Sequence, residues 1–204
     1  MLLEYPKPYI HDAALAIILG GSEDRRYSWV KRALHKGQLT RLRKGLYLIE
    51  KKDSSLIDTF EIAQQLYGPS YISFETALSY HGWAPEAVYT TMSASAKRSH
   101  SVRTPIGMFS YEHTPRDQFF MAVERIETKD SLYLIAHPWK ALADYMYVRR
   151  KKWKTFADVI EDLRLDEFRV EAADKEPLKE IARYYHSPRV RRFAQMILKE
   201  NRWI

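Results

Sequence analysis

The 204-residue chain contains no cysteine, which excludes disulfide bonds, thiolate metal ligands and cysteine nucleophiles. No stretch approaches the roughly 18 apolar residues that a membrane-spanning helix needs. The first residues, Met1 to Pro6, lack the basic start and apolar run of a secretory leader. These absences lead us to expect a cytoplasmic protein that does not engage a membrane. The hydrophobic share of 46% is ordinary for a packed globular chain.

Motifs of several enzyme classes are missing too. Glycine is scarce, and the Gly20-Gly21 pair belongs to no phosphate-binding pattern. There is no Gly-x-Ser-x-Gly nucleophile motif. The 7 histidines include no i, i+4 pair and no close ligand spacing. We therefore expect a protein that is not an enzyme, with no catalytic residues, no metal and no cofactor.

One enzymatic alternative stays open. Asp117, Glu127 and Lys129 follow the order Asp, Glu-x-Lys of metal-dependent nucleases, in which two carboxylates hold a divalent ion. Charged residues at short gaps produce this order easily by chance. A nuclease or RNA-processing enzyme is therefore the alternative to a binding protein.

The positive charge of the chain is concentrated near the N-terminus. The stretch from Ser22 to Lys52 holds ten lysine and arginine residues and three acidic residues. Its surplus equals the formal net charge of the whole chain, +7, so the remaining residues are balanced. A concentrated positive field attracts polyanions, of which nucleic acid is the commonest strong one. A solvated basic surface that binds nothing is the alternative interpretation.

The basic stretch has the pattern of a helix followed by a β-hairpin. A first helix is predicted from Asp12 to Leu19, with Asp12 as its cap, and a second from Arg26 to Lys36, closed by Gly37. Its apolar residues at helical spacing are expected to face the core. They are Tyr27, Val30, Ala33 and Leu34. A polar stripe on the same helix consists of Ser28, Lys31, Arg32 and His35.

Two β-prone runs, Gln38 to Arg43 and Leu46 to Ile49, surround Lys44-Gly45 and predict a hairpin. A loop at Lys44-Gly45 pairs Leu42 with Tyr47 and puts Arg41 and Arg43 together on the opposite face. Helix and hairpin together are the parts of a winged helix, whose recognition helix fits the major groove of duplex DNA. The expected DNA-binding residues are Ser28, Lys31, Arg32, His35, Lys36, Thr40, Arg41, Arg43 and Lys44.

The rest of the chain predicts an α+β domain with a small antiparallel sheet followed by helices. Ser55 and Asp58 resemble a capping box that opens a helix from Leu56 to Tyr67, and Ser73 caps another that runs to His81. The expected strands are Val88 to Ala94, Gly107 to His113, Phe119 to Ile126 and Ser131 to Ala136. The expected C-terminal helices are Trp139 to Val148, Thr155 to Leu165, Glu176 to Tyr185 and Pro188 to Asn201. Residues 1–68 are predicted to form the winged-helix domain, and residues 69–204 the second domain.

Three blocks of sequence resemble the AbiEi-family antitoxins of type IV toxin–antitoxin systems. Lys36 to Tyr47 (KGQLTRLRKGLY) resembles the end of the recognition helix and the wing, where a basic Leu-Arg-Arg-Gly-Val-Tyr-like run is common. Ser73 to Gly82 (SFETALSYHG) is similar to the helix that follows the winged domain. Ile135 to Asp144 (IAHPWKALAD) is similar to the family segment Ala-Ser-Pro-Glu-Lys-Ala-Leu-x-Asp. The blocks occur in the family order and span about Leu34 to Asp144.

The resemblance implies a transcriptional repressor that binds its own promoter as double-stranded DNA. It also implies an antitoxin that counteracts a nucleotidyltransferase-like toxin, generally without forming a stable complex with it. The oligomeric state is left open, because operators with inverted repeats favour dimers but no interface is evident from the sequence.

The chain departs from the family pattern in two places. Only two helices are predicted before the wing, whereas family members usually have three. His137 and Trp139 replace the usual Ser and Glu of the third block, while Lys140 and Asp144 remain and are predicted to form a local i, i+4 ion pair.

The C-terminal helix offers a second candidate basic surface, made of Arg189, Arg191 and Arg192. Its apolar residues, including Val190 and Phe193, share one face at helical spacing. Such a helix contacts DNA, an acidic protein or its own domain. A protein-interaction adaptor with basic docking surfaces is therefore a further alternative function.

Overall fold

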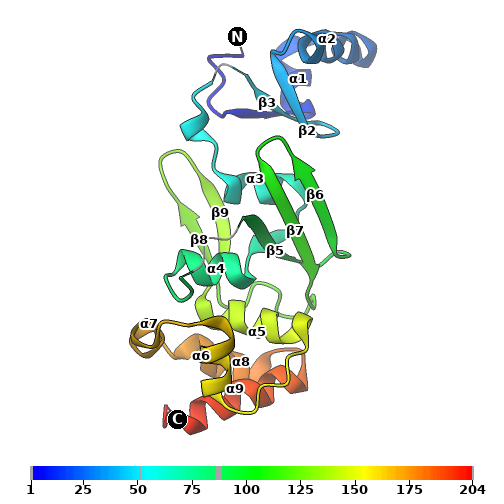
Figure 1. The fold of residues 1–204 in the computed structure, drawn as a ribbon. Helices are drawn as coiled ribbons and strands as arrows, with labels where there is room; N and C mark the ends of the chain where they lie inside the picture. The colour runs from blue at the N-terminus through cyan, green and yellow to red at the C-terminus, as the bar shows by residue number, and fades with distance from the viewer. Residues whose placement is uncertain (1, 51, 86–88, 204) are drawn as a thin grey trace.

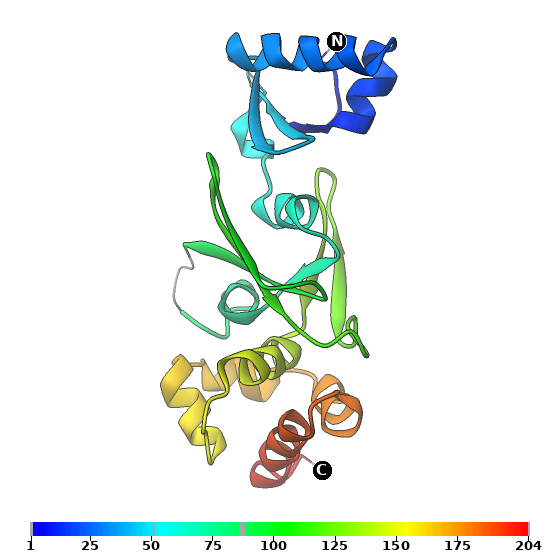
Figure 2. The same cartoon turned by 90° about the vertical axis from the view of Figure 1, so that its right-hand side faces the viewer.

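A computed structural model describes residues 2–50, 52–85 and 89–203, which form an elongated molecule in three tiers (Figure 1). A small N-terminal unit lies at one end, a six-stranded sheet in the middle and a group of helices at the other end. The first and last tiers are far apart along the long axis (Figure 2). Helices and two sheets in one chain confirm the α+β class.

The N-terminal unit carries two helices on one face of a three-stranded antiparallel sheet of order β1-β3-β2. Its elements are β1 (Tyr9–His11), α1 (Asp12–Leu19), α2 (Glu23–His35), β2 (Leu39–Arg43) and β3 (Leu46–Ile49). The first helix has the predicted bounds, although His11 and not Asp12 is its cap. The second begins three residues earlier than predicted, because the Ser22 hydroxyl caps it by accepting from the Arg25 backbone N–H at 3.3 Å. Strand β1 was not predicted, since three residues are too few for a periodic pattern.

Strand β3 is buried on both of its faces, and this joins the unit to the rest of the molecule. Tyr47 and Ile49 pack in a small core with side chains of α1 and α2. Leu46 and Leu48 belong to the main core, together with Ile62 of the next helix. The N-terminal sheet therefore has helices on one side and the second module on the other.

A β-bulge in the hairpin makes the predicted register wrong. The Lys44-Gly45 loop is where the sequence predicts it, and Arg43 lies opposite Leu46. Tyr47, however, pairs with Arg41 and not with Leu42, which is the extra residue between two ladder positions. Leu42 is buried in the main core, so burial of this side chain is the gain that accompanies the irregular register.

Helix α3 (Thr59–Leu66) packs against three strands of the larger sheet. A 3-10 turn, η1 (Ser54–Leu56), precedes it. Asp58 is its N-cap and accepts from the backbone N–H groups of Phe60 and Glu61, so the capping box predicted from Ser55 is wrong. By packing, α3 belongs with the larger sheet, and the change of module comes after β3 and before α3, ahead of the predicted boundary at 68/69.

The larger sheet has the order β6-β7-β5-β4-β9-β8 among the described residues. Its strands are β4 (Ser70–Ile72), β5 (Thr90–Ser95), β6 (His100–Thr104), β7 (Gly107–His113), β8 (Val123–Glu127) and β9 (Leu132–Ala136). The sheet is mixed and not purely antiparallel as predicted, since β5 pairs with β7 and β4 with β9 in parallel. Side-chain alternation reports which face of a strand is buried but not the direction of its neighbour.

The bounds of most predicted strands hold, with specific exceptions. The predicted start at Phe119 is wrong, because Gln118 and Ala122 have positive φ and residues 118–122 form turns before β8. Val88 lies outside the described residues. Two strands were missed: β4 is only three residues long, and β6 is a mostly exposed, polar edge strand.

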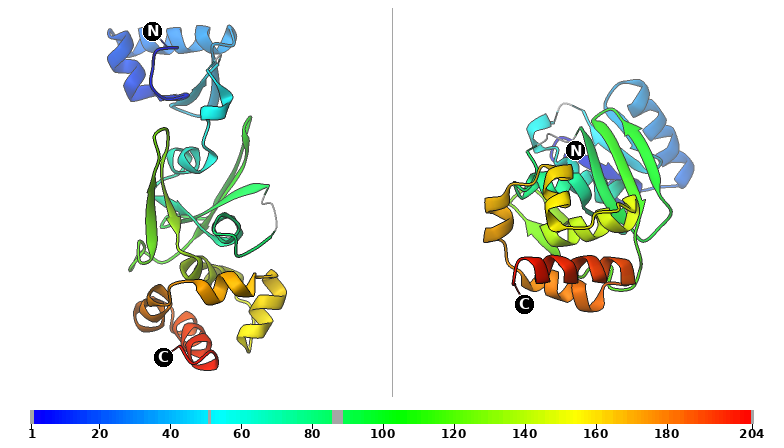
Figure 3. Two further views of the ribbon diagram at one scale, coloured as in Figure 1. Left: turned by 90° about the vertical axis from the view of Figure 1, so that its left-hand side faces the viewer. Right: turned by 60° about the horizontal axis from the view of Figure 1, so that its bottom comes forward.

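The remaining helices are α4 (Phe74–Tyr80), α5 (Pro138–Arg149), α6 (Phe156–Leu163), α7 (Glu167–Ala172), α8 (Glu176–Tyr184) and α9 (Pro188–Glu200). Figure 3 shows α8 and α9 beside each other next to α5, where all three are in contact. All but α7 fall where the sequence predicts helices, and a capping box at Thr155 and Asp158 begins α6. No helix in the described ranges has both the length and the apolar composition to cross a membrane.

A buried carboxylate connects β4, α5 and α8. Asp144 is fully buried, and its Oδ2 accepts from the Tyr71 hydroxyl at 2.8 Å and the Ser73 hydroxyl at 2.9 Å. Its Oδ1 accepts from Lys140 Nζ at 2.7 Å and from the Tyr185 hydroxyl at 2.9 Å. Burial, reinforced by the Asp144 charge, raises the pKa of both tyrosines well above their ordinary value. The predicted Lys140–Asp144 ion pair is confirmed, but it lies in the core and is shared by three elements.

We expect Asp144→Asn to lower the free energy of unfolding by about 3–5 kcal/mol, because it leaves the Lys140 ammonium buried without a counter-charge. Tyr71→Phe removes one hydrogen bond of the same network and is expected to cost about 1 kcal/mol. Urea unfolding followed by circular dichroism measures both changes.

The matched control is Glu176→Gln, which breaks the exposed Lys179–Glu176 pair of the same 2.7 Å length. Its cost should stay within about 0.5 kcal/mol, since exposed pairs contribute little. An Asp144→Asn variant no less stable than Glu176→Gln would contradict the structural role given to the buried carboxylate.

Two histidines meet where α4 ends and α5 begins. His137 is the N-cap of α5, and its Nδ1 accepts from the Trp139 backbone N–H at 3.4 Å. His81 Nε2 lies 3.1 Å from the Ala136 carbonyl oxygen, and the two imidazole rings are 6.3 Å apart. Burial, followed by the nearby His81, lowers the pKa of His137 to about 4, and burial lowers the pKa of His81 as well. A neutral His137 thus replaces the usual serine as a cap.

This arrangement predicts a loss of stability in mild acid. Because the folded-state pKa of His137 lies below its ordinary value of 6.5, its contribution is complete above pH 6.5 and declines as the pH falls towards 4. His137→Asn keeps a cap acceptor but does not titrate. The loss between pH 7 and pH 4.5 should be smaller in this variant by about 1 kcal/mol, a linkage value discounted for partial exposure of the ring. Thermal unfolding at a series of pH values tests this, and identical profiles for the two proteins would refute it.

Candidate nucleic-acid interface

Helix α2 lies at the far end of the molecule and turns one face away from it (Figures 1 and 2). Val30 and Ala33 hold its inner face on the small core. On the outer face the whole predicted stripe is exposed. Its members are Ser28, Lys31, Arg32 and His35, and Lys36 at the end of the helix is exposed as well.

The bulge separates the two arginines that were predicted to lie together. Cross-strand partners share a face of the sheet, so Arg41 lies on the side of Tyr47, towards α2. Arg43 lies with Leu46 on the opposite side, where its Nε and Nη2 donate to the Gln65 carbonyl at 3.2 and 3.0 Å. Thr40 pairs with Leu48 on that same opposite side. The prediction that Arg41 and Arg43 share a face is therefore wrong, because one extra residue reverses the alternation.

A trough of about 810 Å³ runs between α2 and the β2–β3 hairpin. Lys31 lines it from the helix, and Arg41 and Lys44 line it from the hairpin. Arg26 also borders it, but its Nε lies 3.4 Å from Asp12 Oδ1. The other lining residues are Glu23, Tyr27, Val30, Leu34, Gly45 and Tyr47.

The cations of this surface are not used to hold the fold together. Within the described residues, no ion pair or side-chain hydrogen bond involves Lys31, Arg32, Arg41 or Lys44. The structure thus brings most of the predicted set together on α2 and along the trough. Arg43 is held by α3, and Thr40 faces away from α2.

Tyr27 is a trough residue that the sequence analysis assigned to the core. Its side chain is 69% exposed, and Trp29 is the residue that packs against the small core. The buried side of α2 centres on Val30 and Ala33, and Tyr27 lies at its edge. The available signal was its position four residues before Lys31, which places the two side chains on one row of the helix.

The C-terminal helix uses two of its arginines internally. The Arg189 guanidinium donates to the Met146 carbonyl near the end of α5. Arg191 Nη1 donates to the Tyr185 carbonyl at 2.7 Å, just after α8. Arg192 is exposed. This basic helix therefore caps its neighbours with Arg189 and Arg191 and leaves Arg192 alone of the three predicted residues fully available to a partner.

The residues of the nuclease alternative are not brought together. Asp117 Oδ2 lies 3.0 Å from His186 Nδ1, in the segment before β8. Glu127 ends β8 and pairs with Arg125 at 2.8 Å. No group of three or more potential metal-binding side chains is found in the described parts of the chain.

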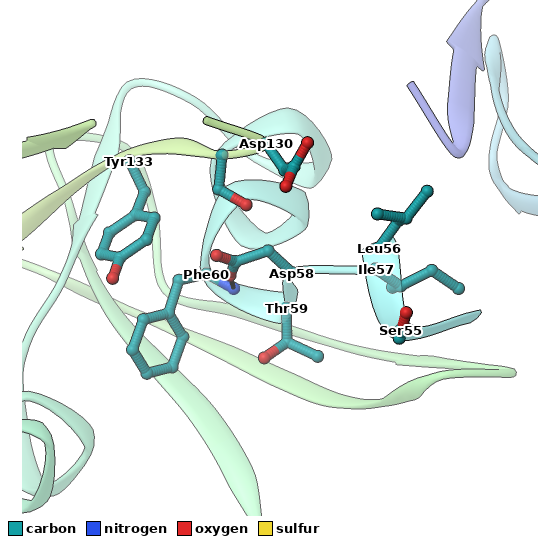
Figure 4. A pocket seen from close by; sticks show the side chains of 9 residues that line it. Ser55, Leu56, Ile57, Asp58, Thr59, Phe60, Asp130 and Tyr133 are labelled. Carbon is teal, nitrogen blue, oxygen red and sulfur yellow. Dashed lines mark hydrogen bonds between the residues drawn. The ribbon is translucent and has the colours of Figure 1, made fainter. Parts of the chain in front are cut away.

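A smaller hollow of about 380 Å³ lies between η1, the start of α3 and the β8–β9 loop (Figure 4). Its polar groups have structural partners: Asp58 caps α3, and the Tyr133 hydroxyl donates to that of Tyr80 at 3.3 Å. Asp130 lies at the rim, where its backbone carbonyl accepts from Lys7. The hollow joins the tiers and carries no convergent catalytic set.

No family model matches the chain, and no curated protein matches it. Two of the segments that resemble the antitoxin family nevertheless touch in the structure. Ser73 from the second block donates to Asp144 from the third, and His81 lies against the Ala136 carbonyl. The residues that carry these two parts of the resemblance are therefore core residues that hold α4 against α5.

Proposed function

We propose that this protein is a cytoplasmic regulator that binds duplex DNA through its N-terminal unit. In this proposal the unit is a winged helix, with α2 as the recognition helix and the β2–β3 hairpin as the wing. The observation that carries the proposal is the row of exposed, unpaired cations on α2 and along the trough, Lys31, Arg32, Arg41 and Lys44 among them. Their concentration in a chain that is otherwise charge-balanced favours a polyanionic partner.

The geometry of the unit suits a duplex. A helix about 10–12 Å across fits a major groove roughly 12 Å wide, and α2 lies at an unobstructed end of the molecule. With α2 in the groove, the trough beside it faces the flanking sugar–phosphate strand, to which Arg41 and Lys44 donate. The proposed DNA-contacting residues are Ser28, Lys31, Arg32, His35, Lys36, Arg41 and Lys44. Arg43 and Thr40 are left out because they face the second module.

The biological role that we propose follows from the resemblance to AbiEi antitoxins. The protein represses its own promoter and counteracts a nucleotidyltransferase-like toxin. Support comes from the order of the three matching blocks and from the contact between the second and third. Neutralisation resides in the second module, because the cations of the N-terminal unit are engaged with DNA.

The double variant Arg41→Glu, Lys44→Glu tests DNA binding. It reverses the charge of two side chains that hold no structural partner among the described residues, so the fold should persist while affinity for the upstream DNA falls. We expect a loss of at least tenfold and a shallower dependence of affinity on salt, since two phosphate contacts disappear. Fluorescence anisotropy at several salt concentrations gives both quantities.

The matched control is Arg192→Glu, Lys199→Glu, which reverses two exposed charges on α9 at the other end of the molecule. It changes the net charge by the same amount and should leave the salt slope unaltered. Equal losses in both variants would mean that only net charge matters, and no loss in either would refute DNA binding by this surface. A protein that binds an acidic protein but no DNA would support the adaptor alternative.

The antitoxin role is tested by growth. The nucleotidyltransferase encoded next to this gene is expressed from an independent promoter, which removes any effect of repression. Co-expression of the wild type and of the Arg41→Glu, Lys44→Glu variant should restore growth equally, since the second module is intact in both. Failure of the wild-type protein to restore growth would refute the antitoxin role and leave DNA binding untouched.

A further inference from the structure

Tyr27 stands out on the cationic surface because it is a large aromatic side chain without partners. It is 69% exposed, and among the described residues it makes no hydrogen bond and no ring contact. Single exposed aromatics are common on protein surfaces and need no explanation by themselves. Tyr27 differs in its position, because it lines the trough beside Lys31 and next to the exposed stripe.

The charges along α2 place Tyr27 at a boundary. Glu23 lies one turn before it and Lys31 one turn after it, and all three line the trough. Phosphates are attracted at the Lys31 end, where Arg41 and Lys44 face the helix, and repelled at the Glu23 end. The path of a bound strand therefore ends near Tyr27, and from there the first half of α2 faces base edges.

The major groove offers an aromatic ring very little apolar surface. Its base edges present nitrogen and oxygen donors and acceptors, and the one apolar group among them is the 5-methyl of thymine. Residues in the first half of a recognition helix are those that reach base edges. Tyr27 is the fifth residue of α2, which begins at Glu23.

We infer that Tyr27 is a specificity-determining residue whose ring packs against the 5-methyl group of a thymine in the bound duplex. This inference rests on the proposed DNA binding and adds to it a base that is read and the residue that reads it. The ring edge makes the contact and the hydroxyl stays in water, so the interaction is apolar. Its loss changes the preference for sequence and not the attraction to phosphate.

The test begins with the duplex that full-length protein selects from a random pool. Each thymine is replaced in turn by deoxyuridine, which removes only the methyl group. At one position the wild type should lose about three- to tenfold in affinity, the size expected for one buried methyl group. Tyr27→Ala should lose a similar factor on the thymine duplex and should not respond to deoxyuridine at that position. Tyr27→Phe should behave like the wild type.

The matched control is Tyr184→Ala, which removes another exposed tyrosine, on α8. It should bind as tightly as the wild type and respond to deoxyuridine in the same way. Tyr27→Ala should also keep the wild-type dependence of affinity on salt, because no phosphate contact is removed.

Two results would overturn the inference alone: no position at which deoxyuridine weakens the wild type, or a Tyr27→Ala variant that still responds as the wild type does. In both cases tight binding and its sensitivity to Arg41→Glu, Lys44→Glu would survive. Failure of that charge reversal to weaken binding would instead overturn the proposed function. A chain that selects no duplex would overturn both.

Discussion

The burial of β3 on both faces is the constraint on which the N-terminal unit depends. Tyr47 and Ile49 hold the two helices, and Leu46 and Leu48 hold the unit against α3. A four-residue strand with four buried apolar side chains can satisfy two cores at once only if its neighbours adapt. Strand β2 adapts by a bulge at Leu42, which fills the main core and turns Arg43 away from Arg41. The distribution of charge on the proposed DNA surface is thus a consequence of packing.

The second module depends on a different interaction, the carboxylate of Asp144. Four donors from β4, α5, α8 and the residue before α4 converge on it, which satisfies a charge that would otherwise be costly to bury. Two segments far apart in the sequence, both similar to AbiEi antitoxins, meet through this group. A resemblance carried by such residues speaks first for shared packing, and any shared function has to be tested separately.

Much of the local structure could be predicted from the sequence. Asp12–Leu19 and Gly107–His113 have the predicted bounds, and the Lys44-Gly45 loop is where glycine's positive φ and the flanking β-prone runs place it. The exposed stripe on α2 followed from helical spacing alone. Strands of three residues and the exposed strand β6 escaped prediction, because they carry too few side chains or too little alternation to form a pattern.

The sequence by itself determined where the charge is concentrated, which segments are helical and which side chains share a helix face, because these depend on neighbours within a few residues. Only the tertiary structure decided the parallel pairing in the larger sheet, the attachment of α3 to it, the separation of Arg41 from Arg43 and the exposure of Tyr27. Each of these outcomes depends on contacts between residues distant along the chain. The free energy of such burial is set by the partner surface, and no local pattern contains that information.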